Sequence, residues 1–131
     1  MPLTHTAALL TISTPHFDRL VHFYQQLLDQ SPVTLLPNIY AEFQLPGMKL
    51  GIFQPTPNPP CEAWRSPTPF PQPPTYSMSL CLEVSNLESA IAHLTQIGFP
   101  PTEEILVASH GREIYAYDPD GNWLILHQSY S

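Results

Sequence analysis

The chain has 131 residues, of which 43% are hydrophobic and 11% are charged, a composition typical of a folded globular protein and not of a disordered one. This length fits one domain and excludes two independent hydrophobic cores. Four basic residues face eleven acidic ones, and the formal net charge is -7. Because no basic patch can then neutralise a run of phosphates, we expect no nucleic acid and no anionic membrane as partner.

The two cysteines and the first residues indicate where the protein resides. Cys61 and Cys81 form neither a disulfide framework nor a C-x-x-C pair, so we expect reduced thiols and a cytoplasmic location. The N-terminal segment lacks a basic region followed by a long apolar run, and no segment reaches the ~18 apolar residues of a membrane span. Neither export nor membrane insertion is expected.

The first part of the chain predicts a strand, a helix and three more strands. The apolar segment 7–12 predicts the first strand, and Thr14-Pro15 after it is a pair typical of a helix start. From Phe17 to Leu28, apolar residues recur at three- and four-residue spacing, which predicts an amphipathic helix. The three short strands that follow are expected at Val33–Leu36, Ile39–Leu45 and Lys49–Gln54.

The second part of the chain repeats this order. A strand is expected at Ser79–Val84, followed by Ser85-Asn86-Leu87-Glu88, a capping box in which Ser85 caps the helix and Glu88 reaches back. A helical stripe ends near Gly98. Three further strands are expected at Ile105–Ala108, Arg112–Tyr117 and Trp123–Gln128. Each half is therefore a βαβββ module, and a lone module would leave one sheet face bare.

The domain organisation follows from this repeat. We predict a single domain, 1–131, with a first module at 7–54, a proline-rich connection at 55–75 and a second module at 76–131. The connection holds nine prolines in 21 residues, which excludes a helix or an inner strand. It is interpreted as a stiff crossover, with a lid over a cavity as the alternative.

Several segments resemble one protein family. Asp118-Pro119-Asp120-Gly121-Asn122 followed by Trp-Leu-Ile-Leu resembles the recurrent final turn and strand of the vicinal-oxygen-chelate superfamily, which includes glyoxalases, bleomycin-resistance proteins and extradiol dioxygenases. The segment from Gly111 to Tyr117 is similar to the family's preceding strand, and Leu20-Val21-His22-Phe23-Tyr24 to the end of its first helix. The resemblance implies an α+β fold, in which two paired βαβββ modules form a curved eight-stranded mixed sheet around a cavity, with the helices outside.

The resemblance also implies a metal site, which this sequence does not supply. Family enzymes hold a divalent ion with His, Glu or Gln side chains on the first and last strands of each module. The positions that match are Leu9, Gly51, Ser79 and Ile125, and none is a first-rank ligand for a divalent ion. We therefore expect no metal at these positions and no cofactor. Glyoxalase-type isomerisation and extradiol ring cleavage, which depend on that ion, are put in doubt.

Strand alternation predicts which side chains line the cavity. Aromatic surfaces with a few polar groups suit a small organic ligand, neutral or cationic. The predicted ligand-binding residues are Tyr40, Glu42, Phe53, Glu83, Arg112, Trp123 and His127.

The same alternation assigns the neighbouring residues of the last hairpin. Hairpin pairing places Glu42 opposite Gly51 and Ile114 opposite His127. It assigns Tyr115 and Tyr117 to the core against the helix. Cys81 is interpreted as a buried small hydrophobe, because the carboxylate of Glu83 two residues away disfavours its thiolate.

Three functions remain open on the sequence alone, and no catalytic residue is assigned. The first is a metal-free protein, expected to be a homodimer, that binds a small organic molecule. The second is a divalent-metal-dependent lyase, isomerase or dioxygenase with Glu42, Glu83 and His127 as displaced ligands. The third is a protein-interaction module that uses the proline-rich connection.

Overall fold

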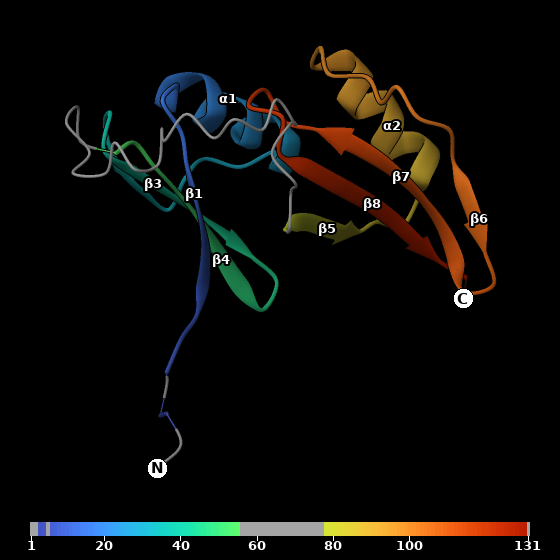
Figure 1. Ribbon diagram of the computed structural model, residues 1–131, viewed down its shortest axis with the longest axis horizontal. Coiled ribbons are helices and arrows are strands. Elements are labelled where there is room, and N and C mark those ends of the chain that lie inside the picture. The colour runs from blue at the N-terminus through green and yellow to red at the C-terminus, as the bar shows by residue number, and fades with distance from the viewer. Residues whose placement is uncertain (1–2, 5, 56–77, 131) are drawn as a thin grey trace, which may run out of the picture. The chain divides into compact units, whose positions relative to one another are not determined.

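The computed structural model describes residues 3–4, 6–55 and 78–130, and the described residues form two compact units within residues 1–66 and 67–131 (Figure 1). The βαβββ order predicted for each half is confirmed. The first module comprises β1 (Leu9–Ser13), α1 (Phe17–Leu28), β2 (Thr34–Leu36), β3 (Tyr40–Leu45) and β4 (Met48–Phe53). The second comprises β5 (Ser79–Glu83), α2 (Leu87–Gln96), β6 (Leu106–Ala108), β7 (Gly111–Tyr117) and β8 (Trp123–Ser129). All but the first residue of the proline-rich connection lies outside the described residues.

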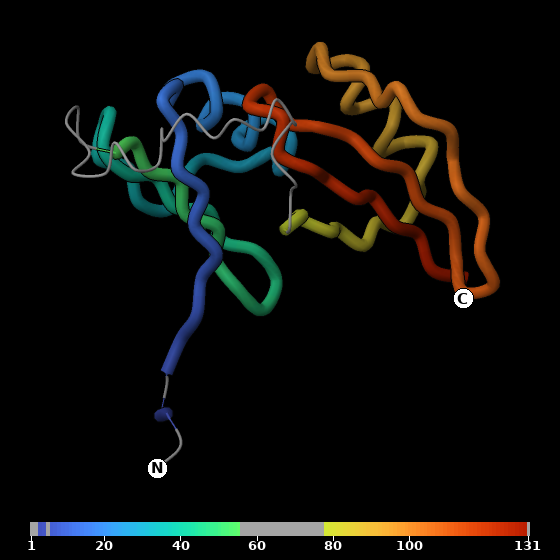
Figure 2. The backbone as a smooth tube through the Cα atoms, viewed as in Figure 1, coloured from blue at the N-terminus to red at the C-terminus, as the bar shows by residue number. Residues whose placement is uncertain are grey.

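Each module folds into one mixed sheet of four strands, and Figure 2 traces the path of the chain through them. The strand orders are β1-β4-β3-β2 and β5-β8-β7-β6. The first strand of each module runs parallel to the last, and the other neighbours are antiparallel. The eight expected strands are therefore present, but hydrogen bonds join them as two sheets of four instead of one sheet of eight.

The helices cover one face of each sheet because their apolar stripes match the buried strand positions. In the first module Leu20, Phe23 and Tyr24 of α1 are buried, as are Phe43 of β3 and Leu50 of β4. In the second module α2 lies against β8 and buries Leu87 and Leu94. With 12 and 10 residues, these amphipathic helices are short, and no helix in the described part of the chain is long and apolar enough to cross a membrane.

Both helices begin later than the sequence predicts. Thr14 is buried and accepts a hydrogen bond from the His16 backbone N–H at 2.9 Å, so it stabilises the turn before α1 while His16 is the N-cap. Asn86, and not Ser85, caps α2 and accepts from the Ser89 N–H at 2.8 Å. Glu88 is then the second residue of the helix instead of the third, which a capping box requires.

The register of the β7–β8 hairpin also differs from the prediction. Glu113 pairs with His127, and Ile114 pairs with Leu126. The reason is the turn at 118–122, where the Asp118 N–H donates to the Asn122 carbonyl at 3.0 Å, whereas Leu45 pairs with Met48 across a two-residue turn in the first module. When the pairing register shifts by one residue, each side chain of the strand moves to the opposite face of the sheet.

Candidate functional site

The four positions that the family resemblance assigns to metal ligands lie on one face of each sheet. We call this side the helix-free face, because it is opposite the helix. Leu9 is 47% exposed there, and Ile125 alternates with the buried Leu124 and Leu126. A Cβ atom added to Gly51 would lie 2.9 Å from the Tyr40 hydroxyl. The Tyr40 side chain therefore lies against Gly51, and none of the other three positions carries a first-rank ligand, so these positions do not suit a metal ion.

Tyr40 and Glu42 form a local network on the helix-free face of the first module. The Tyr40 hydroxyl donates to Glu42 Oε1 at 2.7 Å, and Lys49 Nζ lies 3.1 Å from Glu42 Oε2. Burial and the neighbouring Glu42 carboxylate raise the pKa of Tyr40 to about 12. The hydrogen bond from Tyr40 and the contact with Lys49 lower the pKa of Glu42. Both Glu42 oxygens thus already have partners, which disfavours Glu42 as a displaced metal ligand.

Glu83 and His127 are brought together on the helix-free face of the second module. They pair across β5 and β8, and Glu83 Oε1 lies 2.8 Å from His127 Nδ1. The other carboxylate oxygen accepts the Ser129 N–H at 2.7 Å. The hydrogen bond with His127, followed by that from Ser129, lowers the pKa of Glu83. Of the proposed displaced ligands, this pair lies together, whereas Glu42 belongs to the separate network with Tyr40 and Lys49.

His110 and Glu113 complete a group with His127 that the sequence reasoning missed. One donor atom from each of the three residues lies within 4.8 Å of the others. Glu113 was missed because the predicted register turned it toward the helix. His110 was missed because a histidine in a turn is usually only solvated. One feature of the sequence does point to this group. His110 and Glu113 lie three residues apart on either side of Gly111, at the start of the strand that pairs with the strand of His127.

An aromatic group lies on the same face, and it corrects the assignment of two tyrosines to the core. The ring centroids of Tyr115 and Trp123 are 5.6 Å apart, and those of Tyr117 and Trp123 are 6.4 Å apart. Tyr117 is 38% exposed and Trp123 is 36% exposed. In the observed register both tyrosines share a face with Trp123 and Ile125.

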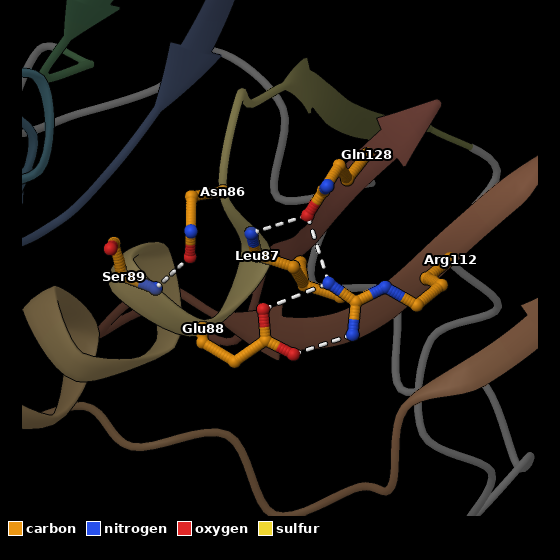
Figure 3. A network of polar contacts seen from close by, with 6 residues as sticks. All are labelled: Asn86, Leu87, Glu88, Ser89, Arg112 and Gln128. Atoms are coloured by element: carbon orange, nitrogen blue, oxygen red, sulfur yellow. Dashed lines mark hydrogen bonds and ion pairs between the residues drawn. The ribbon is translucent and has the colours of Figure 1, made fainter. Parts of the chain in front are cut away.

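Arg112 lies on the opposite face, so its assignment to the ligand-binding surface is wrong. It binds Glu88 of α2 through two nitrogens, and Nη2 lies 2.8 Å from Glu88 Oε1 (Figure 3). Nη2 also donates to Gln128 Oε1 at 2.9 Å. The same Gln128 oxygen accepts the Leu87 backbone N–H at 2.7 Å. Arg112 therefore joins the first turn of α2 to β7 and β8.

The ion pair between Arg112 and Glu88 predicts that the stability of the fold falls in acid. The hydrogen bonds from Arg112 lower the pKa of Glu88 from its ordinary 4.5 to about 2. Because the folded-state pKa is depressed, the contribution of Glu88 to stability is present above pH 4.5 and is lost as the pH falls toward 2. We expect Glu88→Gln to show a smaller loss of stability over this range than the unmodified protein, measured by urea unfolding at several pH values. Glu103→Gln, at an exposed position outside this network, is the control, and an equal effect of both variants would contradict the prediction.

Cys81 is exposed, which corrects its assignment as a buried residue. Partial burial and the carboxylates of Glu113 and Glu83 raise the pKa of its thiol. A raised pKa disfavours the thiolate, so Cys81 lacks the activation of a nucleophile. Cys61 lies outside the described residues.

The helix side of the first module carries a shallow, open hollow. It lies between the first turns of α1 and the region of β2, and its lining includes Phe17, Val21, His22 and Leu35. Phe53, the remaining predicted ligand-binding residue, is half-buried on the helix-free face opposite Tyr40. The hollow is therefore separate from the predicted ligand-binding residues of this module.

Comparison with known proteins agrees with this fold. No curated protein matches the chain in sequence. A solved structure of a glyoxalase/bleomycin resistance protein from Catenulispora acidiphila is 17% identical, has a TM-score of 0.67, and aligns over 96% of this chain and 100% of that one. A protein from Agrobacterium tumefaciens is 22% identical, with a TM-score of 0.72 over 98% of this chain and 100% of that one. A glyoxalase-related enzyme from Fulvimarina pelagi is 19% identical, with a TM-score of 0.67, and aligns over 97% of this chain and 89% of that one.

The family assignment itself comes from the sequence. The family model of the Glyoxalase/Bleomycin resistance protein/Dioxygenase superfamily matches residues 3–126. This match includes the first module, the second module up to Leu126 of β8, and the Asp118–Asn122 turn that carries the resemblance. The chain therefore belongs to the glyoxalase/bleomycin resistance protein/dioxygenase superfamily.

Proposed function

We propose that the protein binds a small organic molecule, neutral or cationic, on the helix-free faces of its sheets, without a metal ion at the family's positions. The observation that carries this proposal is the aromatic group of Tyr115, Tyr117 and Trp123. We also propose that it acts as a cytoplasmic homodimer, of the kind in which resistance proteins of this superfamily sequester a drug.

The aromatic group supports a ligand with a flat apolar surface. Tyr117 and Trp123 each keep more than a third of their surface exposed, whereas rings that serve only the core are covered. Aromatic rings offer a large contact area with few side-chain rotations to immobilise. Ligand pockets use such rings together with a few polar anchors.

The carboxylates on the same face favour a neutral or cationic ligand. Glu113 precedes Tyr115 and Tyr117 at alternate positions of β7, and Glu83 lies two strands away on β5. With a net charge of -7, the protein attracts cations and repels anions. An ammonium or guanidinium group over an aromatic ring gains about 0.5–2 kcal/mol, which adds to the carboxylate contact.

The first module contributes a smaller surface of the same kind. Tyr40 and Phe53 pair across β3 and β4, and the hydrogen bond to Glu42 holds the Tyr40 ring against Gly51. This fixed ring offers a rigid contact. A metal-dependent enzyme with Glu42, Glu83 and His127 as one ligand set is less well supported, because Lys49 and Tyr40 already engage Glu42.

Ligand-dependent melting tests this function. We expect members of a panel of neutral and cationic aromatic compounds to raise the melting temperature. Bleomycin is included because resistance to it is one of the functions for which the superfamily is named. Trp123→Ala should weaken binding of an active compound about 30-fold, since losing an aromatic anchor costs about 2 kcal/mol.

The control is Tyr130→Ala, which removes a 51% exposed aromatic residue beyond the end of β8. It should leave the ligand-induced shift unchanged. Equal shifts in Trp123→Ala and the unmodified protein would overturn the assignment of this surface. Native mass spectrometry of the same samples reports the bound compound and the number of chains.

A further inference from the structure

We propose that His110, Glu113 and His127 form a binding site for a divalent transition-metal ion, with Zn²⁺ as its best-fitting ion. The donor atoms of the three side chains lie within 4.8 Å of one another. All three residues belong to the β6–β7 turn and the β7–β8 hairpin of the second module. They are different residues from Leu9, Gly51, Ser79 and Ile125, so this site is separate from the family's metal positions.

The backbone brings the three residues together. Glu113 and His127 are paired across β7 and β8, and His110 ends the turn from which β7 starts. The Tyr130 N–H donates to the His110 carbonyl at 3.2 Å and ties this turn to the end of β8. The imidazoles of His110 and His127 stack with centroids 5.3 Å apart and an interplanar angle of 17°.

Gly111 makes room for the His127 ring. A Cβ atom at this position would lie 3.0 Å from both Cε1 and Nε2 of His127 and 2.5 Å from the Gln128 carbonyl oxygen. Glycine inside a strand often marks such a close approach. The ring edge that carries Nε2 therefore lies against Gly111, immediately beside His110.

Glu83 fixes the orientation of the His127 ring. Its Oε1 lies 2.8 Å from Nδ1, and its Oε2 accepts the Ser129 N–H, so the carboxylate is held from two sides. When Nδ1 carries the hydrogen and donates it to this carboxylate, Nε2 keeps a free lone pair that can bind a metal ion. A carboxylate on the far nitrogen is the usual partner of a histidine that binds metal.

The donor set indicates which ion fits. Two imidazole nitrogens and one carboxylate oxygen suit Zn²⁺ and its transition-metal neighbours, whereas Mg²⁺ and Ca²⁺ prefer oxygen ligands alone. Donors around a tetrahedral ion with bonds of ~2.0–2.1 Å lie ~3.3 Å apart. His110 is exposed, so rotation of its side chain can close the remaining gap. Three protein ligands leave a fourth position for water or for an oxygen of a bound molecule.

The first module supplies an internal comparison. Because Tyr40 pairs with Phe53 as Glu113 pairs with His127, these are the corresponding positions of the two sheets. Ser13 pairs with Phe53 as Glu83 pairs with His127. The first module thus has serine and aromatic residues where the second has two carboxylates and a histidine. The βαβββ fold that both modules share therefore does not by itself require metal-binding side chains at these positions.

Titration calorimetry with ZnCl₂ tests the site on the full chain, without an affinity tag and after removal of metal with a chelator. We expect one high-affinity Zn²⁺ per chain. His110→Ala, in an exposed turn, and Glu113→Gln should each remove it. Glu83→Gln should weaken binding about 10- to 100-fold, as expected for a residue that orients a ligand. His22→Ala, at an exposed histidine of α1, should leave binding unchanged.

Co²⁺ gives a second readout that does not depend on affinity. Bound in tetrahedral geometry by two nitrogens, one carboxylate oxygen and a water molecule, it should give intense visible absorption bands that disappear in His110→Ala, while circular dichroism shows an intact fold. Absence of stoichiometric Zn²⁺ binding would overturn the proposal. So would binding that survives in His110→Ala or is lost equally in His22→Ala. Neither result depends on whether an organic ligand binds the aromatic group.

Discussion

Replacing Asp118 with alanine is expected to lower the free energy of unfolding by about 3 kcal/mol. The side chain is 3% exposed, and its Oδ1 accepts the backbone N–H groups of Asp120 and Asn122, both at 2.9 Å. Its Oδ2 accepts from Asn122 Nδ2 at 2.8 Å. A hydrogen bond to a charged group contributes about 1.5–3 kcal/mol, and the three bonds are not additive. Urea unfolding followed by circular dichroism measures the loss.

The conservative variant Asp118→Asn separates the charge from the turn geometry. Its Oδ1 can still accept both backbone N–H groups, so we expect a loss of about 1 kcal/mol, since charge-assisted hydrogen bonds are roughly twice as strong as neutral ones. A loss below about 1 kcal/mol in Asp118→Ala would show that the turn does not depend on this carboxylate. The turn matters beyond stability because it sets the register of β7 and β8.

The second large effect is expected for Gly111→Ala, which should cost about 1–3 kcal/mol, the usual range for an overpacked site. The new Cβ would lie 2.5 Å from the Gln128 backbone oxygen, and the backbone cannot rotate away as a side chain can. The β7–β8 pairing must therefore shift. Because the same Cβ meets the His127 ring at 3.0 Å, Zn²⁺ binding should weaken in this variant as well.

Gly51→Ala is the matched control, since Gly51 is also buried in a strand. The nearest atoms to its added Cβ are the hydroxyl and Cε1 of Tyr40, at 2.9 and 3.0 Å, and Cγ2 of Thr11 at 3.2 Å, all of them in side chains. Both neighbours are side chains, and the Tyr40 ring can rotate away by giving up its hydrogen bond to Glu42, whereas the Gln128 backbone oxygen cannot, so the loss in urea unfolding should be smaller than for Gly111→Ala. A larger loss of stability in Gly51→Ala than in Gly111→Ala would contradict this explanation.

The candidate sites show how one family scaffold can hold different chemistry. The positions that match the family's metal ligands are occupied by two aliphatic residues, a glycine and a serine, and Tyr40 lies against the glycine, Gly51. The donors of the proposed ion are instead at the β6–β7 turn and the adjoining ends of β7 and β8. A shared fold therefore supports the family assignment more strongly than it supports any reaction.

The order of elements could be predicted because it depends on local patterns. The alternation of apolar residues in β4 and β8 and the helical stripes from Phe17 and from Leu87 are set by side-chain periodicity within each segment. Helix starts were less well predicted, since Ser85 and Asn86 are both good caps. The choice of Asn86 depends on where the chain leaves β5 and on the bond from the Leu87 N–H to Gln128.

The sequence by itself determined the family, the two βαβββ modules, the lack of first-rank ligands at the family's metal positions and the placement of Glu83 and His127 on the same face of the sheet. Only the tertiary structure decided which residues of β7 share a face with His127. That choice depends on the geometry of the Asp118–Asn122 turn, and one residue of difference moves Glu113 to the helix-free face and Arg112 to the helix. The group of His110, Glu113 and His127 was hidden for this reason, because its members meet only through that register.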